Sequence, residues 1–323
     1  KSNRNQVTGN VSATYNFLPN LSLMLRTAVD LSYEDRSQQR PFSTNKYATG
    51  MFRTQNIFNQ EVNSDFLLKY DGKLGDKFEY TVTGGGSRMM NRYKRDELRA
   101  DQLLYPNIYT FANSKNQLIA LPYQSEYAVN SLYALGSLSY DNFLYMDVTA
   151  RNDWGSTLAT PTSTDNVSFF YPSISLSGVI SEKVKMPEFI SFLKLRASLA
   201  SVGSGGVDPY LTDYVYVAST FPSSLSNPQV IANPTLKPLR TISKEVGLDV
   251  KMLNSRLNLD FTAYQSNTYD QIIRSPIDRA TGYSSVILNA GEIQNRGLEV
   301  QLSGKPLVNK DGFNMEIYGN FSL

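Results

Sequence analysis

Apolar and polar residues alternate along most of this chain with a period of two. Residues 21–33 read LSLMLRTAVDLSY, in which the odd-numbered positions are apolar apart from Thr27, while the even-numbered positions include Arg26 and Asp30. Successive side chains of a strand point to opposite faces, so this pattern predicts a β-strand with one apolar and one polar face. The stretch is also longer than an ordinary strand of about 5–6 residues.

The same alternation recurs elsewhere, and helical periodicity is absent apart from a turn or two around residues 183–192. The other alternating stretches are residues 10–17, 130–140, 143–152, 193–199, 257–263 and 313–317. With the less regular segments between them, they predict an all-β fold of about twelve antiparallel strands, arranged in six hairpins.

The expected connections alternate between short and long. Short turns are predicted at residues 18–20, 71–77, 141–142, 181–191, 253–255 and 306–312. Long loops are predicted at residues 34–58, 91–125, 154–168, 203–240 and 268–296. Repeated long loops are uncommon in a compact soluble domain, whereas outer-membrane barrels have short periplasmic turns and long external loops. The pattern therefore predicts a large antiparallel transmembrane β-barrel, with apolar faces toward lipid and polar faces toward the lumen.

Composition narrows the possible functions. The 323 residues include no His and no Cys, which excludes disulfides, Cys nucleophiles, Ser-His-Asp triads and ordinary zinc sites. With 31 Lys and Arg against 29 Asp and Glu, the net charge of +2 gives no bias toward nucleic acid. The 21 Tyr and 16 Phe suit strands and membrane–water boundaries. We expect no enzyme activity, catalytic residue, cofactor, metal site or nucleic-acid partner.

The chain shows no signal peptide. None of its apolar stretches approaches the length of about 18 residues that a transmembrane helix needs. Neither observation argues against a barrel, because barrel strands cross the membrane with only about 9–11 residues of alternating polarity.

Several distinctive motifs follow one another in the second half of the chain. They are ARNDW at residues 150–154, FFYPSISLS at 169–177, FISFLKLRAS at 189–198, NPTLKP at 233–238, EVGLD at 245–249, GYSS at 282–285 and NAGEIQNRGLE at 289–299. In this order and at these spacings they resemble the C-terminal part of the barrel of SusC/RagA-type TonB-dependent outer-membrane transporters of Bacteroidota. Residues 1–140 fit the same barrel by pattern but carry few distinctive motifs.

The resemblance implies a barrel of about 22 strands in the outer membrane of a Gram-negative bacterium, closed by an N-terminal plug. It implies nutrient uptake, the import of oligosaccharides (glycans) or peptides, with a SusD-like surface lipoprotein as partner and TonB acting through the plug. Residues 1–323 are then expected to form part of the barrel, in contact with outer-membrane lipid, without the plug domain or the TonB box. Two alternatives remain open: a siderophore-type TonB-dependent receptor, and a non-transporting adhesin or soluble β-sandwich binding protein.

The motif residues are expected to be mainly structural. They are Arg151, Asn152, Asp153, Trp154, Asn233, Pro234, Lys237, Pro238, Asn289, Gly291, Glu292, Asn295, Gly297 and Glu299. Arg151 and Asp153 share a strand face and can pair in the lumen wall, while the amphipathic ring of Trp154 suits the headgroup level. The two prolines predict a rigid lead-in to a strand at 241–252.

In the last motif, Gly291 and Gly297 permit a bend or bulge and Asn295 tolerates a left-handed backbone. Glu292 and Glu299 are a possible acid–base pair, but they are also ordinary lumen or loop charges.

Two further segments suggest binding. The 203–240 loop carries four aromatic residues that suit contact with substrate or a lid, or packing within the loop itself: Tyr210, Tyr214, Tyr216 and Phe221. A run of basic residues can contact lipopolysaccharide phosphates or lie in a solvated loop, since acidic residues neutralise much of it. Its members are Arg88, Arg92, Lys94, Arg95 and Arg99, with Asp96, Glu97 and Asp101.

Overall fold

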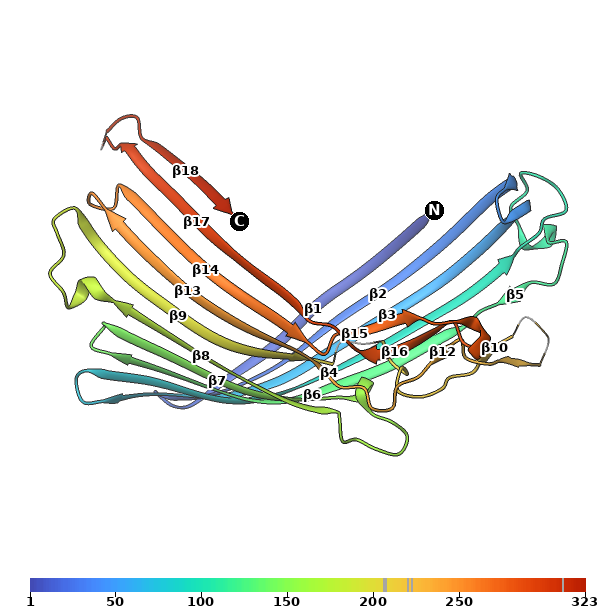
Figure 1. Cartoon of the computed structure of the whole chain (residues 1–323), viewed down its shortest axis with the longest axis horizontal. Coiled ribbons are helices and arrows are strands. Elements are labelled where there is room, and N and C mark those ends of the chain that lie inside the picture. The colour runs from blue at the N-terminus through green and yellow to red at the C-terminus, as the bar shows by residue number, and fades with distance from the viewer. Residues whose placement is uncertain (206–207, 220, 222, 310) are drawn as a thin grey trace.

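The computed structural model describes residues 1–205, 208–219, 221, 223–309 and 311–323. One antiparallel sheet dominates it, with strand order β1-β2-β3-β4-β6-β7-β8-β9-β13-β14-β17-β18 and a short β5 beside β4 (Figure 1). The strands are β1 Ser2–Leu18, β2 Leu21–Thr44, β3 Tyr47–Leu74, β4 Phe78–Ala100, β5 Ile119–Ala120, β6 Tyr123–Tyr140, β7 Leu144–Gly155, β8 Ser168–Val179, β9 Ile190–Ser204, β13 Leu239–Met252, β14 Leu257–Tyr269, β17 Ile293–Leu307 and β18 Met315–Ser322. The predicted all-β, antiparallel class is confirmed.

The remaining elements are short and lie in the connections. They are β10 Val217–Ala218, β11 Leu225–Ser226, β12 Val230–Ile231, β15 Ile272–Pro276, β16 Ser285–Asn289 and the 3-10 turns η1 Phe111–Asn113, η2 Ser156–Leu158, η3 Ile180–Glu182 and η4 Arg279–Thr281. No helix in the described ranges is long and apolar enough to cross a membrane.

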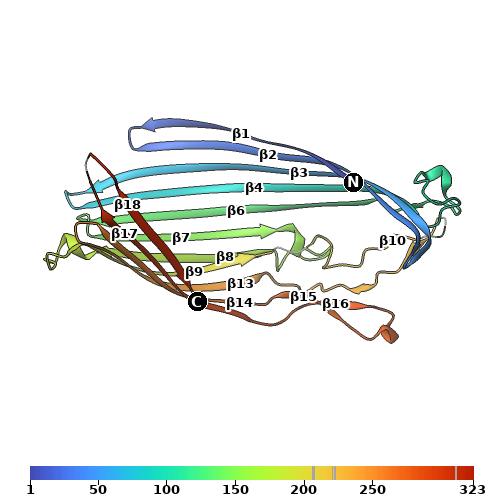
Figure 2. The same ribbon diagram turned by 90° about the horizontal axis from the view of Figure 1, so that it is seen from above.

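The sheet is strongly curved, with β1 and β18 at its two edges (Figure 1). Seen from above, neighbouring strands run side by side along the molecule, and the longer connections gather at one end (Figure 2). The short turns lie at the opposite end, so the predicted alternation of short and long connections is largely present.

One predicted loop is wrong. Strands β2 and β3 stay paired from Leu21 opposite Tyr70 out to Thr44 opposite Tyr47, so residues 34–58 form a long hairpin closed by two residues. Lys46 in this turn has a φ of 75°. The hairpin escaped prediction because both of its faces carry polar residues, which leaves no period-two signal. Strand β4 is extended in the same way, which shortens the predicted 91–125 loop to residues 101–122.

Cross-strand register sorts the side chains into two faces. Arg26 lies opposite Asp65, and the same row continues through Ser87, Ser131 and Asp153. We call this side of the sheet the polar face. Ion pairs bind its strands together: the Arg26 Nε to Asp65 Oδ2 distance is 3.0 Å.

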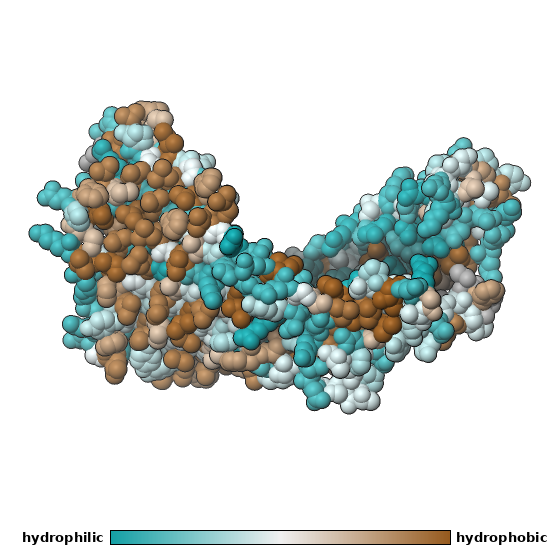
Figure 3. All heavy atoms as spheres, in the orientation of Figure 1, coloured by the Kyte–Doolittle hydropathy of each residue, from teal (hydrophilic) through white to brown (hydrophobic). Residues whose placement is uncertain are grey.

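The opposite side, which we call the apolar face, exposes large hydrophobic side chains. Leu25 lies opposite Phe66, and this row continues through Gly86 to Leu132. Leu25, Phe66 and Leu132 are 53%, 44% and 56% exposed. Apolar side chains gather over the wing that carries β13, β14, β17 and β18, whereas polar ones cover the far end of the other wing (Figure 3). Such an exposed apolar surface fits contact with lipid.

A row of mostly polar residues crosses the apolar face on the side of the long loops. We call it the polar row, and register aligns its members across β2, β3, β4, β6, β7 and β8: Thr27, Ser64, Arg88, Asn130, Trp154 and Ser168. On β4 the stretch from Phe78 at the short-turn end to Arg88 is 11 residues long, both ends included. A tilted barrel strand needs about 9–11 residues to cross a bilayer, so the polar row lies where the strands leave the membrane.

A small apolar core ties the long connections together. Leu158, Leu236 and Ile287 are buried against one another, and they come from the connections that follow β7, β9 and β14. The residues packed around them are Val167, Phe169, Leu211, Val230 and Ile272. The parallel pairing of β12 with β16 adds backbone hydrogen bonds to this junction.

The assignment of the two faces predicts opposite responses on β9. Leu195 is 48% exposed on the apolar face, and Ser198 lies on the polar face opposite Glu245. We expect Leu195→Arg to lower the free energy of unfolding in lipid vesicles by roughly 2–4 kcal/mol, because the new charge faces hydrocarbon near the bilayer midplane. Ser198→Arg should cost much less, since its guanidinium faces an acidic partner. Denaturant unfolding measures both, and equal losses would show that the faces are wrongly assigned.

A second prediction concerns pH at the short-turn end. Lys183 Nζ donates a hydrogen bond to Asp141 Oδ2, and this contact lowers the pKa of Asp141 in the folded state. A carboxyl with a lowered folded pKa contributes stability that is complete above its ordinary pKa and is lost as the pH falls through the folded value. We expect the thermal midpoint to exceed that of Asp141→Asn at neutral pH, and the difference to shrink between about pH 5 and pH 2.

Lys183→Gln is the matched partner variant. If the contact acts as described, combining Asp141→Asn with Lys183→Gln should cost little more than either change alone. Additive losses in the double variant, or a difference that does not change with pH, would contradict the ion pair.

Candidate functional site

Two adjoining hollows lie on the polar face at the long-loop end of the sheet, and we call them the mouth cavities. The larger is about 450 Å³ and is lined by Met89, Tyr127, Asp153, Phe169 and Asp208, among others. The smaller is about 260 Å³ and lies between β6, the connection after β7 at residues 156–161, and residues 209–215. Both are lined by Tyr127, Thr157 and Pro209. Aromatic rings and carboxylates in one wall suit the apolar faces and the hydroxyl or amide donors of a polar cargo.

The ARNDW motif contributes Asp153 to the wall of the larger mouth cavity. Arg151 Nε lies 2.7 Å from Asp153 Oδ1, and Arg151 Nη2 donates to Ser131 Oγ at 2.9 Å. The Tyr171 hydroxyl donates to the other oxygen of Asp153. Asp153 is only 6% exposed, so its charge is compensated within the sheet. The pairing of Arg151 with Asp153 agrees with the prediction from their spacing.

The other two residues of this motif face the opposite way. Asn152 Nδ2 donates to Ser168 Oγ at 3.0 Å, and Trp154 lies in the polar row between Asn130 and Ser168. The position of Trp154 therefore suits a membrane-interface anchor.

The NPTLKP motif at residues 233–238 is hydrogen-bonded to the first residue of the NAGEIQNRGLE motif, Asn289. Asn289 Nδ2 donates to the backbone oxygens of Lys237 and Asp270, each at 2.9 Å, and Lys237 N donates back to Asn289 Oδ1 at 2.9 Å. The side chain of Asn289 thus acts as a clamp between two connections that are far apart in sequence. Asn233 Oδ1 accepts from Thr235 N at 2.9 Å, which stabilises the turn.

Sequence reasoning predicted a rigid lead-in at Pro234 and Pro238 but missed what it anchors. Leu236, between the two prolines, is fully buried in the loop core. The available signal was a single large apolar residue in an otherwise polar, proline-bounded segment. The following strand begins at Leu239, two residues earlier than predicted.

The last motif only partly behaves as predicted. Gly291 has a φ of 85°, which fits the predicted bend. Asn295 and Gly297, by contrast, lie in the regular part of β17, and neither adopts the left-handed backbone or the bulge that its residue type permits. Gly297 instead makes room for a neighbour, because a Cβ there would lie 2.7 Å from the hydroxyl oxygen of Tyr264.

The two glutamates of this motif do not form a pair. Glu292 Oε1 accepts from Asn267 Nδ2 at 2.6 Å, at the start of the strand. Glu299 lies seven residues further along, opposite Thr262 on the polar face. Seven residues of strand extend about 23 Å, which is too far for joint acid–base chemistry. No group of three or more acidic side chains in the described part is placed to hold a metal ion.

The aromatic residues of the 203–240 loop divide into two pairs. The Tyr210 hydroxyl accepts from the backbone N of Glu126 at 3.2 Å, and the Tyr214 ring centroid lies 6.2 Å from that of Tyr283. Tyr216 and Phe221 are 58% and 76% exposed. The first pair therefore helps to hold the loop, while the second projects from it. Their contact with substrate or lid stays a prediction.

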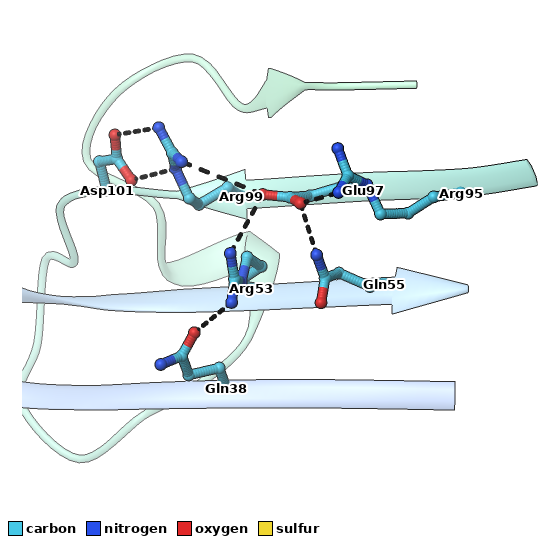
Figure 4. A network of polar contacts seen from close by, with 7 residues as sticks. All are labelled: Gln38, Arg53, Gln55, Arg95, Glu97, Arg99 and Asp101. Atoms are coloured by element: carbon cyan, nitrogen blue, oxygen red, sulfur yellow. Dashed lines mark hydrogen bonds and ion pairs between the residues drawn. The ribbon is translucent and has the colours of Figure 1, made fainter. Parts of the chain in front are cut away.

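The basic run is split between the two faces. On the polar face, Glu97 is buried and accepts from Gln55 Nε2 at 2.6 Å (Figure 4). Three guanidinium groups surround its carboxylate: those of Arg53, Arg95 and Arg99, at 3.5, 3.9 and 4.0 Å. These residues belong to β3 and β4 rather than to a solvated loop, and their contacts join the two strands beyond the polar row.

The even-numbered members of the run lie on the other side of β4. Arg92 Nε lies 2.6 Å from Glu126 Oε1, and Lys94 Nζ lies 3.0 Å from Asp96 Oδ2. These charged residues are close together in the sequence, but alternation along the strand places them on opposite faces of β4. The odd-numbered ones form a network around the buried Glu97, and the even-numbered ones are exposed.

The family model described as "TonB dependent receptor-like, beta-barrel" matches residues 1–323. The TonB-dependent receptor P39 of Formosa agariphila is 28% identical over 301 residues, which cover 89% of this chain and 28% of P39. The TonB-dependent receptor SusC of Bacteroides thetaiotaomicron is 27% identical over 335 residues, covering 96% of this chain and 32% of SusC. This chain therefore spans about a third of the length of these relatives.

Solved structures share the fold. A chain of the RagAB peptide transporter superposes with a TM-score of 0.84 at 21% identity, covering 99% of this chain and 36% of that one. The siderophore receptor PiuA of Acinetobacter baumannii gives a TM-score of 0.61 at 15% identity, covering 99% of this chain and 47% of PiuA.

These matches agree with the SusC/RagA-type motifs and with the expectation that the chain is not an enzyme. Because the family model spans all 323 residues, the chain belongs to the TonB-dependent receptor β-barrel family of the Gram-negative outer membrane.

Proposed function

We propose that the full-length protein imports oligosaccharides or peptides across the outer membrane in a TonB-dependent manner, together with a SusD-like surface lipoprotein. The observation that carries the proposal is the likeness to SusC, which extends over 96% of this chain at 27% identity. The fold similarity to RagAB, which is described as a peptide transporter, supports the same assignment.

The two faces of the sheet support a role in the barrel wall. The polar face carries strand-bridging pairs such as Arg196 with Asp260, whose Nη2 to Oδ1 distance is 2.7 Å. Such a face suits a water-filled lumen, and the apolar face suits lipid. In this proposal residues 1–323 supply part of the wall, while the plug that TonB pulls on lies elsewhere in the protein.

The long-loop end supports cargo or lid contact. The mouth cavities open on the polar face at this end, beside the loop that projects Tyr216 and Phe221. Aromatic rings present apolar faces that stack on sugar rings or side chains, and the nearby carboxylates accept hydrogen bonds. We place the first cargo contact here.

Copurification tests the proposed function. The full-length protein is extracted from native outer membranes in mild detergent, and its stoichiometric partners are identified by mass spectrometry. We expect a surface lipoprotein in equimolar amount, and uptake of oligosaccharides or peptides that is lost when TonB is deleted. Recovery of the barrel alone, with uptake of ferric chelates instead, would favour the siderophore receptor. If the protein shows no uptake and no copurifying partner, the result would favour the non-transporting adhesin.

The exposed tyrosine gives a sharper prediction. Tyr216→Ala should weaken binding of the identified cargo or lipoprotein by roughly threefold to tenfold, because a stacked aromatic contact contributes about 0.5–1.5 kcal/mol. Tyr105→Ala is the matched control, since Tyr105 is 64% exposed in a different loop. Isothermal titration measures both variants. Unchanged binding for Tyr216→Ala would remove this loop from the contact surface.

A further inference from the structure

A hollow lies on the apolar face of the sheet, away from the mouth cavities. It measures about 650 Å³ and is lined by residues of β1, β2, β3, β4 and β6, including Arg26 and Asp65, which pair with each other on the polar face. Its apolar lining consists of Val11, Ala13, Leu25, Phe66 and Leu132. This volume lies within the range of small-molecule sites, about 300–1,000 Å³.

The hollow is built by small residues among large ones. Ala13 leaves space that a larger side chain would occupy, while at Gly86 two neighbouring side chains fill the place of the missing one. A Cβ on Gly86 would lie 2.7 Å from Cε1 of Phe66 and 3.0 Å from Cδ2 of Leu132. The two large side chains are therefore packed against the glycine backbone.

A cation stands at the rim of this hollow. Arg88 is exposed and lines the hollow with Thr27 and Ser64, its neighbours in the polar row. Thr27 Oγ1 and Ser64 Oγ lie 3.2 Å apart. Within the described ranges no acidic side chain pairs with Arg88, whereas the next two cations outward, Arg92 and Lys94, are both paired.

The depth of the hollow in the membrane limits which kinds of molecule can bind in it. The polar row lies where the strands leave the bilayer on the long-loop side, which is the external side in this class of barrel. Apart from Val11, which lies opposite Thr27, the apolar lining is on the membrane side of that row, at the depth of acyl chains, and Arg88 is at headgroup depth. An occupant must therefore present hydrocarbon below and an anion above.

We propose that this hollow binds lipopolysaccharide, with an acyl chain against Leu25, Phe66 and Leu132 and a lipid A phosphate on Arg88. The guanidinium forms charge-assisted hydrogen bonds to phosphate, and one hydroxyl of the hydrogen-bonded pair Thr27 and Ser64 donates to a remaining oxygen. The site anchors the barrel at a defined height in the outer leaflet. It lies on the lipid side of the sheet and does not depend on which cargo is imported.

Direct titration tests the proposal. Full-length protein, delipidated in mild detergent, is titrated with bisphosphorylated lipid A and with dephosphorylated lipid A, and bound lipid is counted by native mass spectrometry. We expect Arg88→Ala to weaken binding of the phosphorylated lipid about tenfold, which corresponds to about 1.4 kcal/mol. The dephosphorylated lipid should bind equally weakly to both proteins.

Two further variants separate the parts of the site. Arg92→Ala removes the same charge from the same strand and face, about 13 Å further outward, and should bind lipid A as the unaltered protein does. Ala13→Phe fills the hollow while keeping Arg88, and should also weaken binding.

Three outcomes would overturn the proposal. They are equal loss in Arg88→Ala and Arg92→Ala, equal binding of the two lipids, and undiminished binding in Ala13→Phe. Dimers that form through this face in place of lipid binding would assign the hollow to a second copy of the chain.

Discussion

Continuous backbone pairing between neighbouring strands is the constraint on which the rest of this structure depends. No water satisfies N–H and C=O groups inside a bilayer, so each strand must pair along its whole buried length. In this sheet the pairing between β3 and β4 runs without interruption from Phe52 opposite Ala100 to Leu74 opposite Phe78. Once that register is set, alternation decides which face every side chain occupies.

The same register also sets where the membrane ends. Thr27, Ser64 and Arg88 come from three consecutive strands and are not neighbours in sequence, yet they form one row because their backbones pair. The lipid-facing surface below them is apolar, while the strands above them carry charges on both faces. Charged residues that are close in sequence consequently differ in burial. Glu97 is buried among guanidinium groups, whereas Lys94 is exposed beside Asp96.

The motifs that identify the family serve mainly to assemble the external connections. Asn289 bonds to the backbone of Lys237, and Leu236 enters a core with Leu158 and Ile287. These contacts hold the connections after β7, β9 and β14 as one unit beside the mouth cavities. These contacts anchor the base of the loop, while side chains such as Tyr216 remain exposed on it.

The sequence alone determined the strand alternation, the twelve-strand antiparallel order, most of the turns and the pairing of Arg151 with Asp153. These features depend on a period of two within one strand or on neighbours along the chain. The tertiary structure decided the extension of β2 to β4 beyond the membrane, where water on both faces removes the hydropathy signal. It also decided the regular backbone at Asn295, the contacts of the Asn289 clamp and the position of Arg88, with which no acidic side chain pairs among the described residues. These features depend on contacts between residues that are distant in sequence. Backbone pairing and loop packing create those contacts, and the local spacing of residues does not specify them.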